Sequence, residues 1–532
     1  MAPRGRTLGE LLEEVARTRP GADAVIFRDQ RLTYSALRAQ VEALARALVG
    51  AGVRRGDRVA ILLPNRPEWL VAAFASAKIG AVTVGVSTFS APREIAWTVK
   101  HCRPAAIVTM ESFRGRQYLA PLYAICPELA RAAPGELASE RLPELRAVIS
   151  IDERRHDGVY RLRDFGERAS AVRGDALAGA APTDACFILY TSGSTATPKG
   201  VVLAHGSVID NGFAIGERMH LSAADRVWLA VPLFWSFGSA NALPAILTHG
   251  GSIVLQESFE AGEALALLDD ERCSVYYGMA NMARALLEHP SRARRALATM
   301  RTGLTIGLPE DVEMTMEAVN ARELCNVYGS TETYGNCAVT DAHDDLALRL
   351  TTQGRPLPGM TIRVVDPASG RTLPPGEVGE FRVKGHVTPG YYNDPDQTRA
   401  AFDHDGYFLT GDLGLMGDDG RVRFRGRLKE MIKTAGMNVA PLEVEAVLLT
   451  HAAVKQAYVV GVPDRARGEL VVAAVELRDG VAATAEALTA FCRERLAGYK
   501  VPARFVFRKA EEFPRTPTGK VQKPRLREEL AP

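Results

Sequence analysis

The chain has 532 residues, more than one hydrophobic core usually holds, so at least two domains are expected. Hydrophobic residues make up 47% of the sequence and charged residues 24%, which are ordinary values for a soluble globular protein. The 65 Lys and Arg nearly balance the 63 Asp and Glu, and the net charge of +2 argues against a broad surface for nucleic acid or anionic membrane.

The first hundred residues predict alternating helices and strands. Leucines at 8, 11 and 12 and Val15 recur at helical spacing and predict an amphipathic helix. Thr33 or Ser35 is placed to cap a second helix that runs to about residue 50. An apolar strand at 59–63, a helix at 68–79 and a strand at 82–84 then give the βαβ pattern of a buried parallel sheet.

The later part of the chain changes in character. A strand at 187–190 leads into a Gly/Ser/Thr loop, and short alternating strands between Pro and Gly turns predict a β-rich subdomain over about 350–428. From Lys429 onward, a helix at 441–449 and a strand at 457–460 are typical of a small α+β domain. We therefore expect an α/β fold, with parallel-sheet subdomains in a large domain over 1–428 and a small domain over 429–532.

The cysteines and the N-terminus bear on the compartment. Met1–Glu10 lacks the apolar core of a signal peptide, and no run of about 18 apolar residues predicts integral membrane contact. Seven scattered cysteines without a CxxC pair predict reduced thiols, a cytoplasmic location and no zinc ligation: Cys102, Cys126, Cys186, Cys273, Cys325, Cys337 and Cys492.

The loop at 191–200 is the most informative segment. It reads Thr-Ser-Gly-Ser-Thr-Ala-Thr-Pro-Lys-Gly directly after a predicted strand. Its hydroxyls and backbone N–H groups can donate to phosphate oxygens, and Lys199 supplies a cation. The spacing is not that of a Walker loop. A solvated turn without a ligand has the same composition, so the residues alone leave both interpretations open.

The loop resembles the phosphate loop of the adenylate-forming superfamily, which includes acyl- and aryl-CoA ligases, luciferases and the adenylation domains of peptide synthetases. Further matches to that family follow in its order and span nearly the whole chain: Val327–Glu332, Tyr407–Gly414, Gly426–Lys433, Gly436–Val439 and Pro514–Lys520. The resemblance implies an enzyme that uses ATP to convert a carboxylic acid into an acyl-AMP and then passes the acyl group to the thiol of coenzyme A.

The resemblance assigns catalytic and nucleotide-binding roles. Because two anions must react, cations have to offset their charge, and Lys520 is expected to reach both. Glu332 is expected to bind Mg²⁺, which needs only one or two carboxylates beside phosphates, and Thr331 to donate to the α-phosphate. Asp412 is expected to accept from the ribose hydroxyls with support from Arg427, and a structural ion pair of these two residues between domains stays open as an alternative.

Other positions are expected to contact adenine, thiol, phosphate or acid. Tyr328 is placed to stack on adenine, or is an ordinary core tyrosine. Lys429 occupies the hinge position about which the C-terminal domain rotates between half-reactions, and Gly436 is expected to line the pantetheine tunnel. Phosphate contacts are expected at Thr191, Ser192, Gly193, Ser194, Thr195 and the catalytic Lys199. The acid pocket is expected at Trp235, Gly278, Ser330 and Gly307, the last of which also contacts adenine.

Three features depart from the family's pattern. Ala196 stands where glycine is common, and alanine at positive φ is strained by ~1 kcal/mol. Ile306 and Leu308 are bulkier than the usual residues and are expected to reshape the pocket. Trp235 stands where many CoA ligases have histidine and amino-acid-activating domains have aspartate, which favours an aromatic or medium-length acid over an α-amino acid. A core tryptophan without a ligand role stays open.

The leading interpretation is an acyl- or aryl-CoA ligase with ATP, Mg²⁺ and coenzyme A. One alternative is a loading enzyme that delivers the acyl group to a carrier protein. Another is an enzyme of secondary metabolism that activates nitrite with ATP to diazotise an aryl amine. A binding protein without catalysis would have no need of Lys199, Glu332 and Lys520. His205, just after the loop, could serve as a general base but is expected to pack against backbone.

Overall fold

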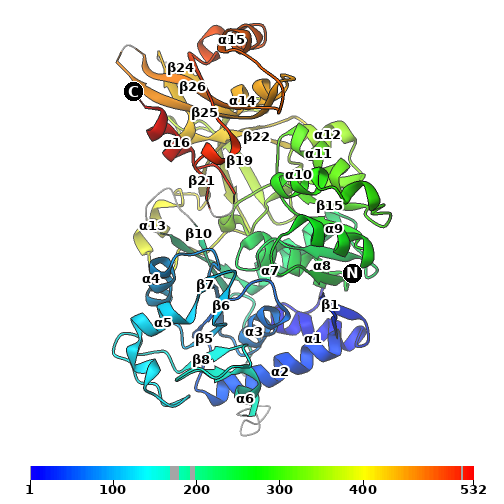
Figure 1. Ribbon diagram of the computed structural model, residues 1–532, viewed down its shortest axis with the longest axis vertical. Helices are drawn as coiled ribbons and strands as arrows, with labels where there is room; N and C mark the ends of the chain where they lie inside the picture. The colour runs from blue at the N-terminus through cyan, green and yellow to red at the C-terminus, as the bar shows by residue number, and fades with distance from the viewer. Residues whose placement is uncertain are drawn as a thin grey trace. The chain divides into compact units, whose positions relative to one another are not determined.

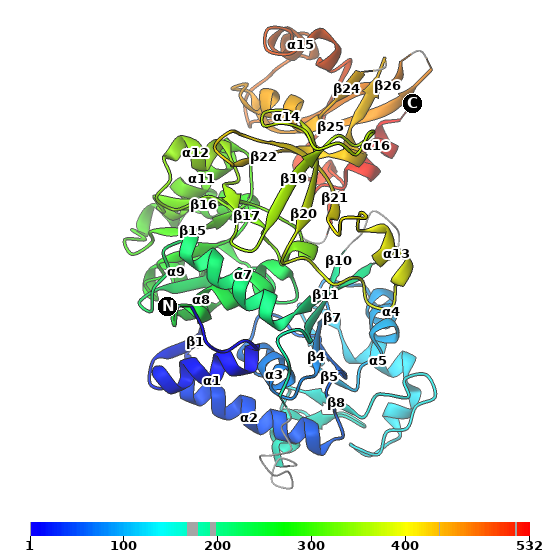
Figure 2. The ribbon, with the colours of Figure 1, turned by 180° about the vertical axis from the view of Figure 1, so that it is seen from behind.

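The structure, a computed structural model, describes residues 2–167, 179–191, 198–435, 437–465, 467–516 and 519–531. The chain separates into two compact units, seen from opposite sides in Figures 1 and 2. The second unit groups the strands of the predicted β-rich segment with the C-terminal residues, whereas the domain boundary expected at Lys429 stays a prediction. The first unit is Met1–Thr361 with Val383–Phe408, and the second is Ile362–Arg382 with Leu409–Pro532.

Three helices pack together at the start of the first unit (Figure 1). The predicted amphipathic helix is α1 (Leu8–Thr18), which Thr7 caps. The second predicted helix is α2 (Tyr34–Gly50), and Thr33 is the cap it uses. Both pack against α3 (Pro67–Lys78), which is buried along nearly its whole length because it lies between them and the sheet.

A seven-stranded sheet of the first unit holds the phosphate-loop hairpin. Its order is β11-β10-β4-β3-β5-β8-β9, and every neighbouring pair is parallel except β10–β11. The predicted βαβ unit is confirmed as β3–α3–β4. The strand expected at 59–63 pairs only to residue 61, because burial extends past the paired residues. The strands are β3 (Arg58–Ile61), β4 (Val82–Gly85), β5 (Ala106–Thr109), β8 (Ala147–Ser150), β9 (Tyr160–Arg161), β10 (Ala185–Thr191) and β11 (Lys199–Ala204).

A nine-stranded sheet supplies the other half of the first unit. Its order is β18-β17-β16-β15-β14-β12-β13-β1-β2, and it is parallel from β16 to β1 with antiparallel strands at both edges. Parallel strands place their carboxyl ends at one edge, which is where ligands bind in open α/β sheets. The strands are β1 (Asp23–Phe27), β2 (Gln30–Thr33), β12 (Arg226–Leu229), β13 (Ser252–Leu255), β14 (Val275–Tyr277), β15 (Thr302–Thr305), β16 (Glu323–Tyr328), β17 (Ala338–Val339) and β18 (Arg355–Pro356).

The remaining elements of the first unit are helices and a small hairpin on these sheets. The hairpin is β6 (Ser112–Phe113) with β7 (Arg116–Gln117). The helices are α4 (Pro92–Cys102), α5 (Leu119–Ile125), α6 (Leu162–Phe165), α7 (His205–Arg218), α8 (Leu243–Thr248), α9 (Ala261–Asp270), α10 (Ala280–Glu288), α11 (Pro309–Val319), α12 (Leu346–Thr351) and α13 (Pro395–Ala400).

Two smaller sheets account for the second unit. One has the order β19-β20-β21-β22, and the other has the order β24-β23-β26-β25 with β27 beside β26. The helix predicted at 441–449 is α14, and the strand predicted at 457–460 lies within β25. The elements are β19 (Thr361–Val365), β20 (Gly379–Lys384), β21 (Phe408–Met416), β22 (Val422–Arg427), β23 (Ile432–Thr434), β24 (Met437–Val439), β25 (Val454–Asp464), β26 (Gly468–Leu477), β27 (Arg504–Phe507), α14 (Pro441–Leu449), α15 (Ala485–Arg493) and α16 (Lys523–Leu530).

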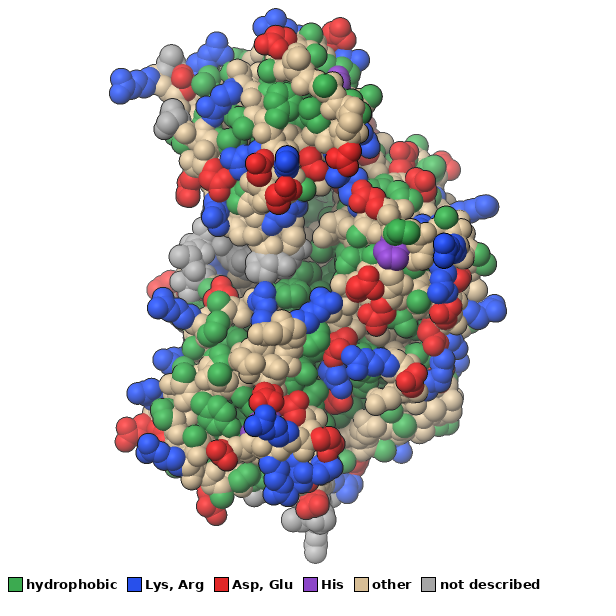
Figure 3. Space-filling view, in the orientation of Figure 1, with side chains coloured by type: hydrophobic (Ala, Val, Ile, Leu, Met, Phe, Trp, Pro, Cys, Tyr) green, Lys and Arg blue, Asp and Glu red, His purple; other side chains and the backbone are tan. Residues whose placement is uncertain are grey.

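The whole is an α/β fold with parallel sheets and a small C-terminal region, as expected from the sequence. Basic and acidic side chains are interspersed on the face seen in Figure 3, in keeping with the net charge of +2. Among the helices of the described ranges, none combines the length and apolar character that a membrane crossing requires.

Candidate active site

Two predicted phosphate contacts close the hairpin of β10 and β11. Thr191 ends β10, Lys199 begins β11, and the two residues lie opposite each other in the antiparallel pair. The hairpin therefore presents the lysine and a hydroxyl at the same end of the sheet. The other predicted phosphate contacts lie outside the described residues, as does the departure at Ala196: Ser192, Gly193, Ser194 and Thr195.

Lys199, Tyr391 and Glu332 form a connected series beside this hairpin. The Lys199 ammonium lies 4.9 Å from the centre of the Tyr391 ring, a cation–π contact. The Tyr391 hydroxyl donates to Glu332 Oε1 over 3.0 Å. Burial, and then the negative charge of Glu332, raise the pKa of Tyr391, so its hydroxyl stays a donor. The sequence predictions do not include Tyr391, whose only sequence signal is the Gly-Tyr-Tyr run at 390–392.

The segment at 388–392 holds Tyr391 in place through backbone hydrogen bonds. The Tyr392 N–H donates to the Gly200 carbonyl over 2.7 Å, so the segment runs beside β11. The Thr388 N–H donates to the Glu332 carbonyl over 2.6 Å. The same segment thus joins the phosphate-loop hairpin to the predicted magnesium ligand.

Hydroxyl groups surround the turn that follows β16. Thr331 begins a short 3-10 helix there, and its Oγ1 lies 3.1 Å from Ser236 Oγ. Ser330 Oγ is buried and has no hydrogen-bond partner within the described structure. Ser236 has no predicted role, although it directly follows Trp235 in the sequence. The turn therefore offers hydroxyl donors next to Glu332.

The predicted glycines follow neighbouring strands of the nine-stranded sheet. A Cβ at Gly307, after β15, would lie 2.5 Å from Asp311 Cβ, and a Cβ at Gly278, after β14, would lie 2.3 Å from the Tyr276 hydroxyl. Packing alone therefore requires glycine at both positions. Tyr328, at the end of β16, is buried. These strand ends meet at the edge where Thr331 and Glu332 lie.

An aromatic cluster adjoins the same edge. Trp235 is half-buried, and its ring lies 5.9 Å from that of Phe234 and 6.1 Å from that of Phe89. Phe89 comes from the loop after β4, and nothing local in its sequence marks it as part of a site. The predicted bulky residue Ile306 is 49% exposed.

These residues fit a nucleotide and Mg²⁺. Lys199 supplies a cation, and the buried, unpartnered Ser330 hydroxyl can donate to a ligand oxygen, which would satisfy a group that is otherwise costly to bury. Glu332 is half-buried, and its Oε1 accepts from the neutral Tyr391 hydroxyl, so the negative charge of the carboxylate remains for a cation. Mg²⁺ takes one or two such carboxylates beside substrate phosphates.

In the second unit, Asp412 and Arg427 lie opposite each other on β21 and β22. Arg427 Nε is 3.3 Å from Asp412 Oδ1, so the two residues form an ion pair, but it lies within a single β-hairpin of one unit and not between domains as the alternative expected. The Asp412 side chain is 8% exposed and that of Arg427 is 55% exposed. A guanidinium so exposed can hold the carboxylate and still face a ligand.

The predicted hinge and the C-terminal lysine also belong to the second unit. Lys429 is exposed in a short 3-10 turn after β22, and Gly436 lies outside the described residues. Lys520 is exposed, and its carbonyl accepts from the Thr516 N–H over 2.8 Å. Partial loss of hydration, and then the Arg427 guanidinium, lower the pKa of the Lys520 ammonium.

His205 packs against backbone, as expected, at the start of α7. Its Nδ1 accepts from the Leu8 N–H over 3.2 Å, which ties α1 to α7. Burial lowers the pKa of His205 to about 4, so the ring is neutral at pH 7. A buried, neutral ring that holds a helix end has a structural function.

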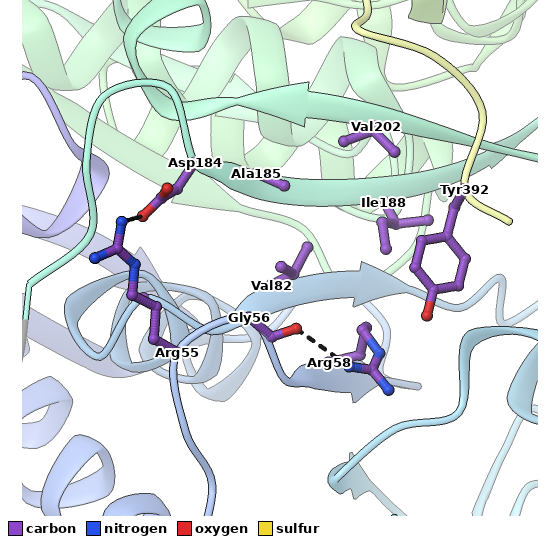
Figure 4. A pocket seen from close by; sticks show the side chains of 10 residues that line it. Arg55, Gly56, Arg58, Val82, Asp184, Ala185, Ile188, Val202 and Tyr392 are labelled. Atoms are coloured by element: carbon purple, nitrogen blue, oxygen red, sulfur yellow. Dashed lines mark hydrogen bonds and ion pairs between the residues drawn. The ribbon is translucent and has the colours of Figure 1, made fainter. Parts of the chain in front are cut away.

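A separate cavity of about 300 Å³ lies beside β3, β4, β10 and β11 (Figure 4). An ion pair of 2.7 Å between Arg55 and Asp184 lies at its edge. None of the described site residues predicted from sequence lines it, so it is not part of the candidate site. Its lining residues are Arg55, Gly56, Arg58, Gly80, Val82, Asp184, Ala185, Ile188, Val202 and Tyr392.

Comparison with known proteins agrees with this geometry. The AMP-binding enzyme family matches residues 12–392, and the AMP-binding enzyme C-terminal domain matches residues 443–520. The chain is 37% identical over 532 residues to YngI of Bacillus subtilis (strain 168), whose name assigns it to the acyl-CoA synthetases, with 98% of this chain and 96% of YngI covered. It is 32% identical over 545 residues to the human mitochondrial medium-chain acyl-CoA ligase ACSF2, with 99% and 88% covered.

Solved structures share the fold over the full length. The crystal structure of ATP-bound MatB from Rhodopseudomonas palustris superposes with a TM-score of 0.85 at 27% identity, covering 98% of each chain. The first family match alone covers more than half of this sequence. The chain therefore belongs to the AMP-binding enzyme family and is a ligase of the AMP-forming acid–thiol type.

Proposed function

We propose that the protein uses ATP to convert an apolar carboxylic acid, aromatic or of medium chain length, into an acyl-AMP and pyrophosphate, and then transfers the acyl group to the thiol of coenzyme A. The observation on which the proposal depends is the meeting of Lys199, Glu332 and Thr331 beside the phosphate-loop hairpin. A cation, a carboxylate and hydroxyl donors in one place suit the phosphates of ATP and the charge that develops on them.

In the first half-reaction, a carboxylate oxygen of the acid attacks the α-phosphorus of ATP. The bond from that phosphorus to the bridging oxygen breaks, and pyrophosphate leaves. Lys199 and the loop hydroxyls hold phosphate oxygens, and Thr331 donates to the α-phosphate. Glu332, oriented by Tyr391, would hold Mg²⁺, which when bound offsets charge on the phosphates. Lys520 stabilises the charge shared by the two reacting groups.

We assign the nucleoside part of ATP to Tyr328, Gly307, Asp412 and Arg427. Tyr328 stacks on the adenine, with Gly307 beside it on the neighbouring strand end. Asp412 accepts from the ribose hydroxyls, and Arg427 keeps that carboxylate oriented through their ion pair. An acceptor-only carboxylate suits two hydroxyl donors on neighbouring carbons.

In the second half-reaction, the thiol sulfur attacks the acyl carbon, the bond from that carbon to the phosphate oxygen breaks, AMP leaves, and the thiol proton is lost to solvent. Lys520 must leave before the thiol arrives, so we place a domain boundary at residues 428 and 429 and a hinge at Lys429. The exposed position of Lys429 in a short turn supports this assignment. Gly436 would line the path of the pantetheine arm, where a side chain obstructs passage.

The acid lies against the aromatic cluster of Trp235, Phe234 and Phe89. Three rings within about 6 Å of one another make an apolar wall that favours a planar or aliphatic acid. The cluster offers no carboxylate to hold a substrate ammonium, which argues against an α-amino acid. Gly278 and Ser330 complete the acid pocket.

The thiols support a reducing compartment. All seven cysteines fall within the described residues, and each is a buried thiol outside any disulfide. Unpaired cysteines are the rule in the cytosol, where glutathione and thioredoxin keep them reduced. We therefore place the protein in the cytoplasm.

A pyrophosphate-release screen tests the proposal. The purified protein is incubated with ATP and Mg²⁺ and with aromatic, medium-chain, long-chain and amino acids, with and without coenzyme A. We expect release with aromatic or medium-chain acids and a coenzyme A thioester by mass spectrometry. Release that depends on nitrite and an aryl amine would indicate diazotisation. Acyl transfer to a carrier protein but not to coenzyme A would indicate a loading enzyme. Either result would overturn the transfer to coenzyme A. No release with any acid would overturn it.

A further inference from the structure

Two histidines and an aspartate meet at the surface of the first unit, apart from the candidate active site. His220 lies just beyond the end of α7, and Asp341 and His343 lie just after β17. His220 Nε2 is 2.8 Å from Asp341 Oδ1, and the two imidazole rings stack with centroids 3.8 Å apart. One ligand atom of each residue lies within 4.8 Å of the other two, and the described residues contain no second group of this kind.

These separations are close to those of a metal site. Tetrahedral zinc with bonds of about 2.0–2.2 Å places neighbouring ligand atoms roughly 3.3 Å apart. The ligand atoms lie within 4.8 Å of one another, so zinc would draw them closer together, and the two imidazoles are at the surface, with the side chains of His220 42% and of His343 59% exposed. Two imidazoles with one carboxylate suit Zn²⁺, whereas Mg²⁺ and Ca²⁺ prefer oxygen ligands throughout.

Groups outside the three ligands orient them as in known metal sites. Glu323 Oε1 lies 3.8 Å from His343 Nε2, within ion-pair range but beyond hydrogen-bond distance. Arg218 Nη1 lies 3.8 Å from Asp341 Oδ2, on the carboxylate oxygen that does not face His220. The His343 N–H donates to Asp341 Oδ1 over 3.0 Å, which holds the two residues in one turn. In zinc sites, the histidine nitrogen and the carboxylate oxygen that do not bind the metal usually have polar partners that orient the ligand.

We propose that His220, Asp341 and His343 bind one zinc ion, with water as the fourth ligand. The ion joins the end of α7 to the segment after β17, and β17 pairs with β16, the strand that leads to Thr331. A metal that binds the folded protein but no preformed site in the unfolded chain stabilises the fold. The role is structural and does not depend on the proposed acid activation.

Calorimetric titration of the metal-free, full-length protein with ZnCl₂ tests the proposal. His343→Ala removes an exposed ligand, and His404→Ala is the matched control because that histidine is 89% exposed in the same unit and outside the group. We expect the wild type and His404→Ala to bind one more equivalent of zinc than His343→Ala. Asp341→Asn should weaken the affinity for that additional zinc ion by at least ~10–100-fold, which is the loss that follows removal of a group that only supports a metal ligand.

The unfolding temperature gives a second measurement. Zinc should raise the unfolding midpoint of the wild type and of His404→Ala more than that of His343→Ala, because only the first two retain all three ligands. Circular dichroism checks that each variant is folded before titration. Equal zinc stoichiometry and affinity in the wild type and His343→Ala, or an equal shift of their midpoints, overturns the proposal.

Discussion

Tyr391→Phe isolates one hydrogen bond of the candidate site. The change removes the hydroxyl that donates to Glu332 Oε1 over 3.0 Å but keeps the ring that faces Lys199. A hydrogen bond to a charged group contributes about 1.5–3 kcal/mol. Because Glu332 is only half-buried, water can replace part of the contact, so we expect the lower end of this range, about 1.5 kcal/mol or roughly tenfold.

The loss should appear mainly as weaker use of Mg²⁺, because Tyr391 orients the proposed metal ligand rather than the acid. Pyrophosphate release is measured over a range of Mg²⁺ concentrations at constant ATP and acid. Tyr392→Phe is the matched control, since it removes the hydroxyl of the next residue, which donates to the Cys102 carbonyl over 3.4 Å. An equal fall in both variants, or no change in Tyr391→Phe, would refute the reasoning.

Three further changes test other parts of the molecule. Lys520→Ala should lower acyl-AMP formation by two to three decades (~3–4 kcal/mol) with an unchanged melting temperature, because the side chain is exposed; an active, folded variant contradicts its role. Lys429→Pro should slow thioester formation more than pyrophosphate release in single-turnover assays, since proline fixes φ at the proposed hinge; equal losses count against the hinge. His205 has a pKa of about 4 in the folded protein against 6.5 in the unfolded chain, so the unfolded chain binds more protons between these two pH values. The contribution of His205 to the free energy of unfolding therefore falls by about 2–3 kcal/mol from pH 7 to 4.5. His205→Gln should flatten that fall in denaturant titrations, and parallel profiles would refute the assignment.

Local patterns predicted individual elements where periodicity and capping residues agree. The helix that begins at Leu8 and the helix at 441–449 are present at these positions, and Thr33 caps the second helix. Strand ends were less predictable, as β3 shows, because apolar residues continue beyond the last paired residue wherever the following chain is also buried. Hydrophobicity reports burial, whereas a strand ends where pairing ends.

Some site residues could likewise be predicted from local motifs, whereas others are brought into the site only by the tertiary fold. The resemblance to the family's motifs predicts roles for Lys199, Thr331 and Glu332, because each lies within a short run of residues that matches the family. Tyr391 could not be found in this way, since it lies 59 residues from the Glu332 it contacts. Phe89 is still farther from Trp235 along the chain, and only the packing of two sheets brings them together.

The sequence by itself determined the family, the α/β class and the order of the nucleotide-binding motifs, because these depend on local propensity and on residue types at fixed short spacing. The tertiary structure decided which hydroxyl orients Glu332, which rings line Trp235 and which imidazoles meet Asp341. His220 lies 121 residues from that aspartate, so their contact depends on how α7 and β17 pack. Strand order and helix packing set such distances, and no local pattern of residues encodes them.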